Sequence, residues 1–395
     1  MSTVLEKLQE LKNIKDDFKE KINAKGGSIT DTTPFSEYPS QVENLSGGSG
    51  GGSVNPIGKY KVVYFDIDGT ILKTDYVESG GTTTPPGDPS YDSEYLKFVG
   101  WTDIPETITR DYVVGARYET ITGDTYLFIR LTENIGLTIP TLQISGSVSI
   151  DWGDGTIGSS KTHTYSDYGD YTIKIRGMTG ITTYLFNDAE SSYLYSLKKC
   201  YLGNSVVILD AFSFLSCRSL EVLLLSKNIT EIGNNPFTEC YNLKSIILPD
   251  SVNYIGFNWF YKCYNLSFVV LPTNITAING NSFSTSYNLE DIVIPNKVTS
   301  IESSAFSNCY NLKSIVIPES VTNIQNNVFS SCYRIKNYIF NCLSVPTLGS
   351  SVFTNIDKTA HIWVRDELVD TYKEATNWST YASYIKPLSE FKGIR

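Results

Sequence analysis

Length, composition and charge already exclude several kinds of protein. The chain has 395 residues, enough for two or three domains, and its 42 acidic and 32 basic side chains leave a net charge of -10. Nucleic acid is thereby excluded as a main partner, because phosphate neutralisation needs clustered lysine and arginine. Hydrophobic residues make up 41% and charged residues 19%, a balance that favours buried cores over disorder.

No segment has the sequence pattern of a membrane or export signal. A signal peptide needs an uninterrupted apolar run of about 7–15 residues, and a spanning helix needs about 20. If the chain is a complete gene product, we expect no membrane insertion and no export by the ordinary route.

The N-terminal segment, residues 1–45, is predicted to dock or oligomerise. Apolar side chains recur at three- and four-residue steps over 4–23, which predicts an amphipathic helix, and an isolated helix of this length is marginal in water. We therefore expect a partner, either a second or third copy of the chain or another protein. The stripe consists of Leu5, Leu8, Leu11, Ile14, Phe18 and Ile22.

The residues after this helix carry a resemblance to a known class. Ile22 to Gly27, followed by Pro34 to Pro39 and Val42, resembles a motif at the start of phage tail and fibre proteins. The resemblance implies that other virion proteins bind the helix. Residues 46–56 contain the run SGGSGGGS, which is typical of a flexible linker.

Residues 57–119 contain a phosphatase-like motif in an unsuitable context. An apolar strand leads into Asp66-Ile67-Asp68-Gly69-Thr70, which resembles the nucleophile motif of haloacid dehalogenase phosphatases. That chemistry needs a following α/β domain, and the next residues lack helical periodicity. With VESGGT, Phe98-x-Gly100-Trp101 and a last strand at 112–118, the segment instead resembles the InlB-type B repeat. This family implies a small β-grasp-like spacer.

Residues 120–178 combine a glycine turn with an aromatic strand. Trp152-Gly-Asp-Gly-Thr and His163-Thr-Tyr, followed by Gly169-Asp-Tyr, resemble a PKD-like β-sandwich. Asp151 and Asp154 could hold calcium. We favour a role in the turn, because aspartate side chains bond to nearby backbone amides in such turns. His163 is then a structural residue beside the turn.

Residues 179–355 repeat with a fixed period of 23. Most cysteines recur at this interval, with Ser286 in the one vacant slot, and phenylalanine, leucine, isoleucine and proline form parallel ladders. A fixed period of this length predicts a solenoid whose rungs bury their apolar faces against one another. The unit F-x-x-C-Y-N-L-x-x-I-x-I-P resembles the BspA-type leucine-rich repeat, which implies a non-catalytic recognition module of surface and virion proteins. The phenylalanine ladder is Phe214, Phe237, Phe260, Phe283, Phe306 and Phe329.

The seven cysteines are interpreted as structural. Stacked thiols could approach disulfide or metal distance, but serine fills the same slot at 286, and an odd number excludes complete pairing within one chain. We favour a buried small side chain that closes the turn. Residues 356–395 should then cover the last rung, with a final strand at 361–365 and a helix that Asp366 caps and that carries Leu368, Val369, Tyr372 and Trp378.

A tyrosine follows each cysteine slot and is the candidate recognition column. Equivalent positions superpose from rung to rung, so these side chains must form a column along one face. If the column is buried, the following asparagines could bind the phenol hydroxyls; if it is partly exposed, it forms a Tyr–Asn strip suited to sugar or protein contact. The column consists of Tyr241, Tyr264, Tyr287, Tyr310 and Tyr333.

These features together predict a mainly β protein without a catalytic, cofactor-binding or metal site. The hypothesis is a non-enzymatic adhesive protein exposed on a bacteriophage virion, as a tail fibre, baseplate appendage or capsid fibre. It would dock by its N-terminus, as a dimer or trimer, and present the solenoid to a host-surface glycan or protein. The alternative is a bacterial cell-surface adhesin built from the same modules.

Overall fold

The computed structural model describes residues 59–133, 136–186 and 196–391. These belong to one compact unit, Asn55–Arg395. The predicted N-terminal helix with its stripe and the linker at 46–56 lie outside the described residues. No helix within the described ranges is long and apolar enough to span a membrane.

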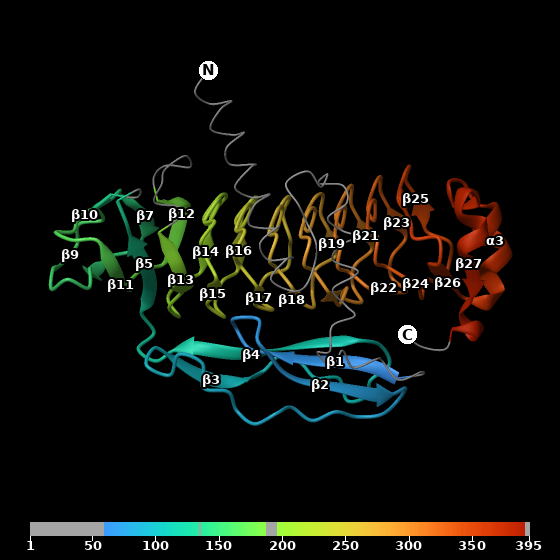
Figure 1. Cartoon of the computed structure of the whole chain (residues 1–395), viewed down its shortest axis with the longest axis horizontal. Helices are drawn as coiled ribbons and strands as arrows, with labels where there is room; N and C mark the ends of the chain where they lie inside the picture. Colours follow the sequence, from blue (N-terminus) through green and yellow to red (C-terminus); the bar gives the residue numbers. More distant parts are fainter. Residues whose placement is uncertain (1–58, 134–135, 187–195, 392–395) are drawn as a thin grey trace, which may run out of the picture. The chain divides into compact units, whose positions relative to one another are not determined.

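A small domain of four strands comes first (Figure 1). The strand order is β2-β1-β4-β3, with β1 and β4 parallel and both outer pairs antiparallel. Successive side chains of a strand point to opposite faces, and β1 buries both: Val62 and Tyr64 on one, Val63 and Phe65 on the other. The strands are β1 (Lys59–Phe65), β2 (Ile71–Glu78), β3 (Leu96–Trp101) and β4 (Tyr112–Thr120). The resemblance to the InlB-type repeat stays a prediction.

The segment predicted as a separate PKD-like sandwich shares both of its main sheets with the solenoid. One sheet has the order β15-β13-β5-β11-β8-β9 and the other β16-β14-β12-β7, so hydrogen bonding crosses the predicted boundary at 178. Antiparallel β5 covers the edge of the first long solenoid strand, β13, an edge that would otherwise be open. The segment thus closes the N-terminal end of the solenoid. Its strands are β5 (Thr125–Leu131), β6 (Thr138–Ile139), β7 (Leu142–Ser145), β8 (Ser149–Asp151), β9 (Ile157–Gly158), β10 (His163–Thr164) and β11 (Gly169–Arg176).

The solenoid places a strand of most rungs in one row and a shorter strand in a second row. Both rows are parallel, and partners differ by 23 positions in pairs such as Phe268 and Asp291, which confirms the predicted period. The first row is interrupted between β15 and β17 and between β20 and β22, which belong to different sheets. It comprises β13 (Leu197–Tyr201), β15 (Val222–Leu224), β17 (Ser245–Ile247), β18 (Phe268–Val270), β20 (Asp291–Ile292), β22 (Ser314–Ile317), β24 (Asn337–Phe340), β26 (His361–Val364) and β27 (Ile385–Pro387). The second comprises β12 (Gly180–Phe186), β14 (Ile208–Leu209), β16 (Glu231–Ile232), β19 (Ala277–Ile278), β21 (Ser300–Ile301), β23 (Asn323–Ile324) and β25 (Thr347–Leu348).

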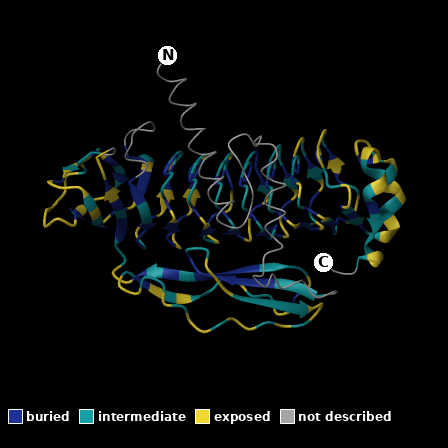
Figure 2. Ribbon diagram, viewed as in Figure 1, coloured by how far each residue is buried: buried dark blue, intermediate teal, exposed yellow. Residues whose placement is uncertain are grey.

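The core of the solenoid is a continuous stack of phenylalanine rings. Neighbouring ring centroids from Phe214 to Phe353 lie 5.2–6.0 Å apart, and every ring of the stack is buried. Figure 2 shows this buried interior between more exposed turns. One apolar cluster extends from Leu127 to Ile385, so the segment after residue 120, the rungs and the C-terminal cap share a single core.

The C-terminal cap covers the last rung, but its helix is shorter than predicted. The single predicted helix is replaced by η4 (Asp366–Leu368), α3 (Val369–Glu374), η5 (Trp378–Tyr384) and η6 (Leu388–Glu390). Asp366 does not cap α3; its carboxylate accepts a hydrogen bond from the backbone of Ser389. The strand at 361–364 is also not the last, because β27 pairs with it. Trp378 is buried and donates to the carbonyl of Pro346 at 2.9 Å.

The cysteine slot is a hydrogen-bonding position between rungs. The thiol of Cys263 donates to the carbonyl of Phe237 at 3.1 Å, and the hydroxyl of Ser286 donates to the carbonyl of Phe260 at 2.9 Å. All seven cysteines are buried and free, and burial raises the pKa of Cys217 to about 12. Among the described residues no group of three or more His, Cys, Asp or Glu could hold a metal ion. The slot therefore closes the turn, and serine and cysteine fill it in the same way.

This equivalence predicts that Ser286→Cys changes the free energy of unfolding by less than about 1 kcal/mol, because the donor to Phe260 remains. Ser286→Ala removes the donor and leaves a buried carbonyl unsatisfied, so a loss of about 1–3 kcal/mol is expected. Guanidinium unfolding of both variants measures the difference. Equal losses in the two variants would contradict the hydrogen-bonding role.

Candidate functional site

The strand face of the central rungs is covered by the chain's own small domain. Val63, Phe65 and Val113 pack on Phe268 together with Ile247, Val270 and Val293, and the rings of Phe65 and Phe268 stack at 5.1 Å. Arg117 pairs with Asp250 at 3.1 Å at the rim. Figure 1 shows β1 and β4 alongside this row of strands. A partner of the solenoid must therefore use another surface, at least along β17 to β20.

A cavity of about 490 Å³ lies beside this contact, where β15 and β17 belong to different sheets. Its walls include Ile67, Leu224 and Ile247. Two ion pairs contribute to the lining: Arg117 with Asp250, and Lys227 with Glu119 at 2.7 Å. Because these basic groups are already paired with carboxylates, the cavity offers a ligand mainly apolar wall.

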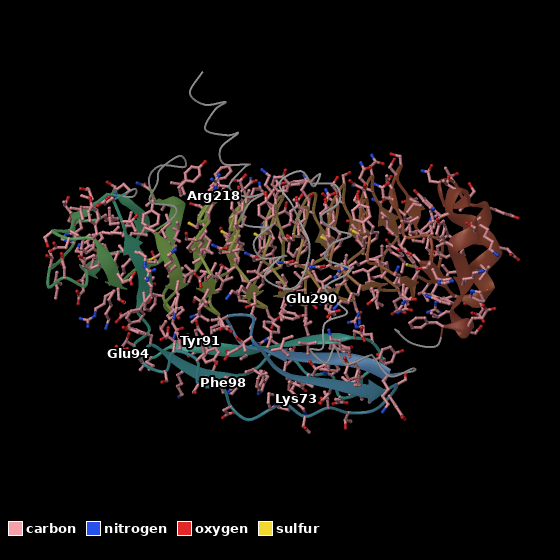
Figure 3. All side chains as sticks on the ribbon, in the orientation of Figure 1. Lys73, Tyr91, Glu94, Phe98, Arg218 and Glu290 are labelled. Carbon is pink, nitrogen blue, oxygen red and sulfur yellow. The ribbon has the colours of Figure 1, made fainter. Side chains whose placement is uncertain are left out.

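The five tyrosines of the candidate column stack directly on one another. Successive ring centroids lie 4.7, 5.0, 4.7 and 5.4 Å apart, with interplanar angles of 22°, 8°, 8° and 39°. The first four rings are half-buried and the last, Tyr333, is 39% exposed. At the other end the guanidinium of Arg218 lies 5.0 Å over the ring of Tyr241. In Figure 3 Arg218 lies toward the solenoid edge away from Tyr91 and Phe98 of the small domain.

The asparagines next to the column bind one another rather than the phenols. Each amide nitrogen donates to the side-chain oxygen of the preceding rung, at 3.1, 3.2 and 2.9 Å from Asn242 to Asn311, and Arg334 continues the ladder at 3.0 Å. The expected Asn–Tyr bonds are therefore corrected. Tyr241 instead donates to Glu239 of its own rung at 3.1 Å.

This arrangement determines which contacts the column can make. Neighbouring rings cover each other's faces, so a sugar cannot stack on the inner rings, as a fully exposed tyrosine would allow. Ring edges, hydroxyls and the amide ladder are what the strip presents. Burial raises the pKa of Tyr287 and Tyr310 to about 12, so these phenols keep their protons at neutral pH. The strip is a regular array of polar groups on a rigid aromatic support.

Asp66 and Asp68, the residues of the phosphatase-like motif, hold the backbone and side chains of the small domain. Asp66 is buried, and one of its oxygens accepts hydrogen bonds from the hydroxyl of Tyr118 and the backbone of Ile67, both at 2.8 Å. Burial raises the pKa of this carboxyl. Asp68 accepts from the backbone of Thr70 at 2.9 Å. Both contacts are those of a structural turn.

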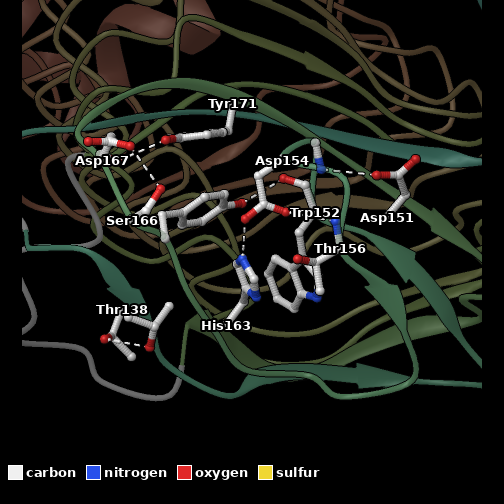
Figure 4. Close-up of polar contacts among 12 residues, drawn as sticks. Thr138, Asp151, Trp152, Asp154, Thr156, His163, Ser166, Asp167 and Tyr171 are labelled. Atoms are coloured by element: carbon white, nitrogen blue, oxygen red, sulfur yellow. Dashed lines mark hydrogen bonds and ion pairs between the residues drawn. The ribbon is translucent and has the colours of Figure 1, made fainter.

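The glycine turn at 151–156 has the predicted geometry (Figure 4). Asp151 accepts from the backbone of Gly153 at 3.0 Å and Asp154 from that of Thr156 at 2.9 Å. The other oxygen of Asp154 lies 2.7 Å from Nε2 of His163, whose ring stacks on Trp152 at 4.9 Å. Burial opposes the charge of Asp154, but these hydrogen bonds outweigh it and lower its pKa. The aspartates and His163 thus stabilise the turn.

The parallel rungs around one stacked core define a leucine-rich-repeat solenoid, a class that generally presents binding surfaces. The family model described as BspA type leucine rich repeat region (6 copies) matches residues 179–299 and 276–391. These ranges cover more than half of the chain, which therefore belongs to the BspA-type leucine-rich repeat family. No curated protein matches the chain.

Several solved structures are similar to parts of the chain. A leucine-rich repeat protein of T. pallidum shares 27% identity over 53% of this chain and 89% of its own, with a TM-score of 0.41. A leucine-rich repeat protein from Bacteroides ovatus shares 19% over 68% and 70%, with a TM-score of 0.36. A leucine rich cell surface protein from Faecalibacterium prausnitzii shares 19% over 56% and 76%, with a TM-score of 0.30.

Proposed function

We propose that this protein is a non-enzymatic recognition protein whose solenoid binds a surface macromolecule through the tyrosine column and its asparagine ladder. The observation that carries the proposal is the half-buried strip of stacked phenols and paired amides, repeated on successive rungs. A rigid strip loses little conformational entropy on binding. Covering of the opposing strand face by the small domain leaves this strip as a surface for partners.

The ligand class follows from the chemistry of the strip. Hydroxyls and amides that recur once per rung suit a protein or glycan on a host surface, contacted along several rungs at once. Because the inner ring faces are covered, hydrogen bonds and ring edges would provide the contacts. Arg218 and Glu239 add one charged pair at the first rung of the column, at 3.0 Å.

The proposed setting is a bacteriophage virion, in which residues 1–45 dock on other virion proteins or form a dimer or trimer and the solenoid faces outward. The alternative is a bacterial cell-surface adhesin. Support for the virion is the resemblance of the N-terminal segment to phage tail and fibre proteins. Immunogold labelling with antibodies against residues 196–391 separates the two: label on released particles supports the virion, and label on cell envelopes supports the adhesin.

The recognition test removes the hydroxyls and keeps the rings. For Tyr264→Phe with Tyr287→Phe we expect fluorescent protein to label a panel of intact bacterial strains about tenfold less, since two hydrogen bonds of about 0.5–1.5 kcal/mol each are lost. The melting temperature should stay close to that of the parent, because the stack remains. Flow cytometry and calorimetry measure the two quantities.

A matched control lies one turn away. Tyr254 is 51% exposed and stands outside the column, so Tyr254→Phe should leave labelling unchanged. Tyr264→Ser with Tyr287→Ser tests the buried interpretation. Lost stability with unchanged labelling would make the column structural and would refute the proposal.

A further inference from the structure

An unusually covered cluster of charged groups joins the small domain to the solenoid. Nζ of Lys61, on β1, lies 3.0 Å from a carboxylate oxygen of Asp291, on β20. Their side chains are 19% and 12% exposed, whereas Arg117 and Asp250 at the rim of the same contact are 38% and 42% exposed. Figure 3 shows Glu290, the neighbour of Asp291, on the solenoid side that faces the small domain. The two partners are separated by 230 positions in the sequence.

A second carboxyl group belongs to this cluster. Val62 pairs with Tyr112 in the parallel register of β1 and β4, so Asp111 lies beside Lys61, whose backbone N–H donates to its side chain at 2.7 Å. Asp111 and Asp291 line one small cavity of about 20 Å³, which is large enough for about one water. The cluster therefore holds one amine and two carboxyl groups with little solvent.

The electrostatics of the cluster favour a proton on Asp111. Burial, together with the charge of Asp291, raises the pKa of Asp111 to about 7, although the Lys61 backbone opposes this. Burial alone would lower the pKa of Lys61, but Asp291 and, more weakly, Glu290 and Tyr76 raise it. Arg110, which lines the same cavity, donates to the carbonyl of Ile294 at 3.4 Å. At neutral pH the cluster thus contains an ion pair beside a carboxyl group that can act as an acid.

We propose that Lys61 and Asp291 condense to an intramolecular isopeptide bond, with Asp111 as the acid that assists the reaction. The ammonium proton first passes to the Asp291 carboxylate, which leaves a neutral amine next to a neutral carboxylic acid. Nζ then attacks the carboxyl carbon and forms the C–N bond. The C–OH bond breaks, Asp111 protonates the departing hydroxyl, and the proton released by nitrogen returns to Asp111. One water leaves, and no oxidant or other reactant is needed.

Two physical effects favour this reaction here over the same reaction in water. The fold holds nucleophile and carboxyl at contact distance, so a bimolecular step becomes intramolecular. The product also replaces two poorly solvated charges by a neutral amide, which removes their desolvation cost. The bond would fix the small domain on the strand face of the solenoid.

Intact-mass spectrometry of the unfolded full chain tests the proposal. The parent is expected to be lighter than its sequence by one water, with a digest product that joins the Lys61 and Asp291 peptides. Lys61→Arg keeps the charge and Asp111→Asn keeps the shape, and both should have the full sequence mass. Asp291→Asn should lose ammonia in place of water, because an amide leaving group replaces the hydroxyl.

The rim provides a matched control. Arg117→Lys creates a second lysine–aspartate pair opposite Asp250, in a more exposed place, and should cause no additional mass loss. A parent protein at the full sequence mass after prolonged incubation in the native state would overturn the proposal. A water loss that persists in Lys61→Arg would overturn it as well.

Discussion

Phe260→Ala is expected to lower the free energy of unfolding of the solenoid by about 3–5 kcal/mol, the usual loss for a fully buried phenylalanine. The ring is inaccessible to solvent and stacks between Phe237 and Phe283, each at 5.4 Å. Its removal leaves a cavity in the middle of the ladder. Because each rung is stabilised mainly by its neighbours, we expect the guanidinium transition to broaden as well as shift.

Tyr264→Ala provides the comparison within the same rung. Tyr264 also stacks on two rings, at 4.7 and 5.0 Å, but it is only half-buried. Its removal should therefore cost clearly less than that of Phe260. Circular dichroism of both variants measures the difference, and equal losses would show that the tyrosine column belongs to the core.

The repeat period predicted the parts of the fold that depend on equivalent positions. A period of 23 places each Phe, Cys and Tyr over its copy, so the ladders follow from the sequence. The side-chain partners did not follow. Period and spacing bring Tyr264 and Asn265 to the same edge, but they do not decide between an Asn–Tyr bond and the observed bond from Asn265 to Asn242.

Backbone geometry within the rung was also hidden. Two residues of each complete rung have a left-handed backbone, as Asn258 and Lys262 do with φ of 57° and 59°. Asparagine is a known sign of this conformation. Lysine is not, and neither is Thr285 with φ of 66°. The stacked neighbours impose these turns, so local sequence preference cannot identify them.

Contacts between different modules were the least predictable. The pairing of β5 with β13 and the packing of β1 and β4 on β18 join segments with no repeat relation. Nothing in a periodic pattern registers one such segment against another. A sign was nevertheless present: Ile247, Val270 and Val293 are apolar at equivalent positions where a solvent-facing strand would carry polar residues.

The second large effect is expected at Gly115, where the backbone of β4 approaches the solenoid. A Cβ at this position would lie 2.5 Å from Cδ1 of Ile247 and 2.9 Å from the ring of Phe65. Gly115→Val should force the small domain away from the strand face, with a loss of about 1–3 kcal/mol or more from overpacking. Hydrogen exchange of amides in β4 and β18 should then become faster.

Two further variants identify the cause of that effect. A Cβ added at Gly87 would meet no atom within 4 Å, so Gly87→Val should leave exchange in β4 unchanged. Ile247→Ala removes the side chain that the introduced valine would meet, and in that background the loss caused by Gly115→Val should shrink. Coupling of this kind is expected only for residues in direct contact. Additive losses in the double variant would show that Gly115 is needed for the strand itself rather than for docking on the solenoid.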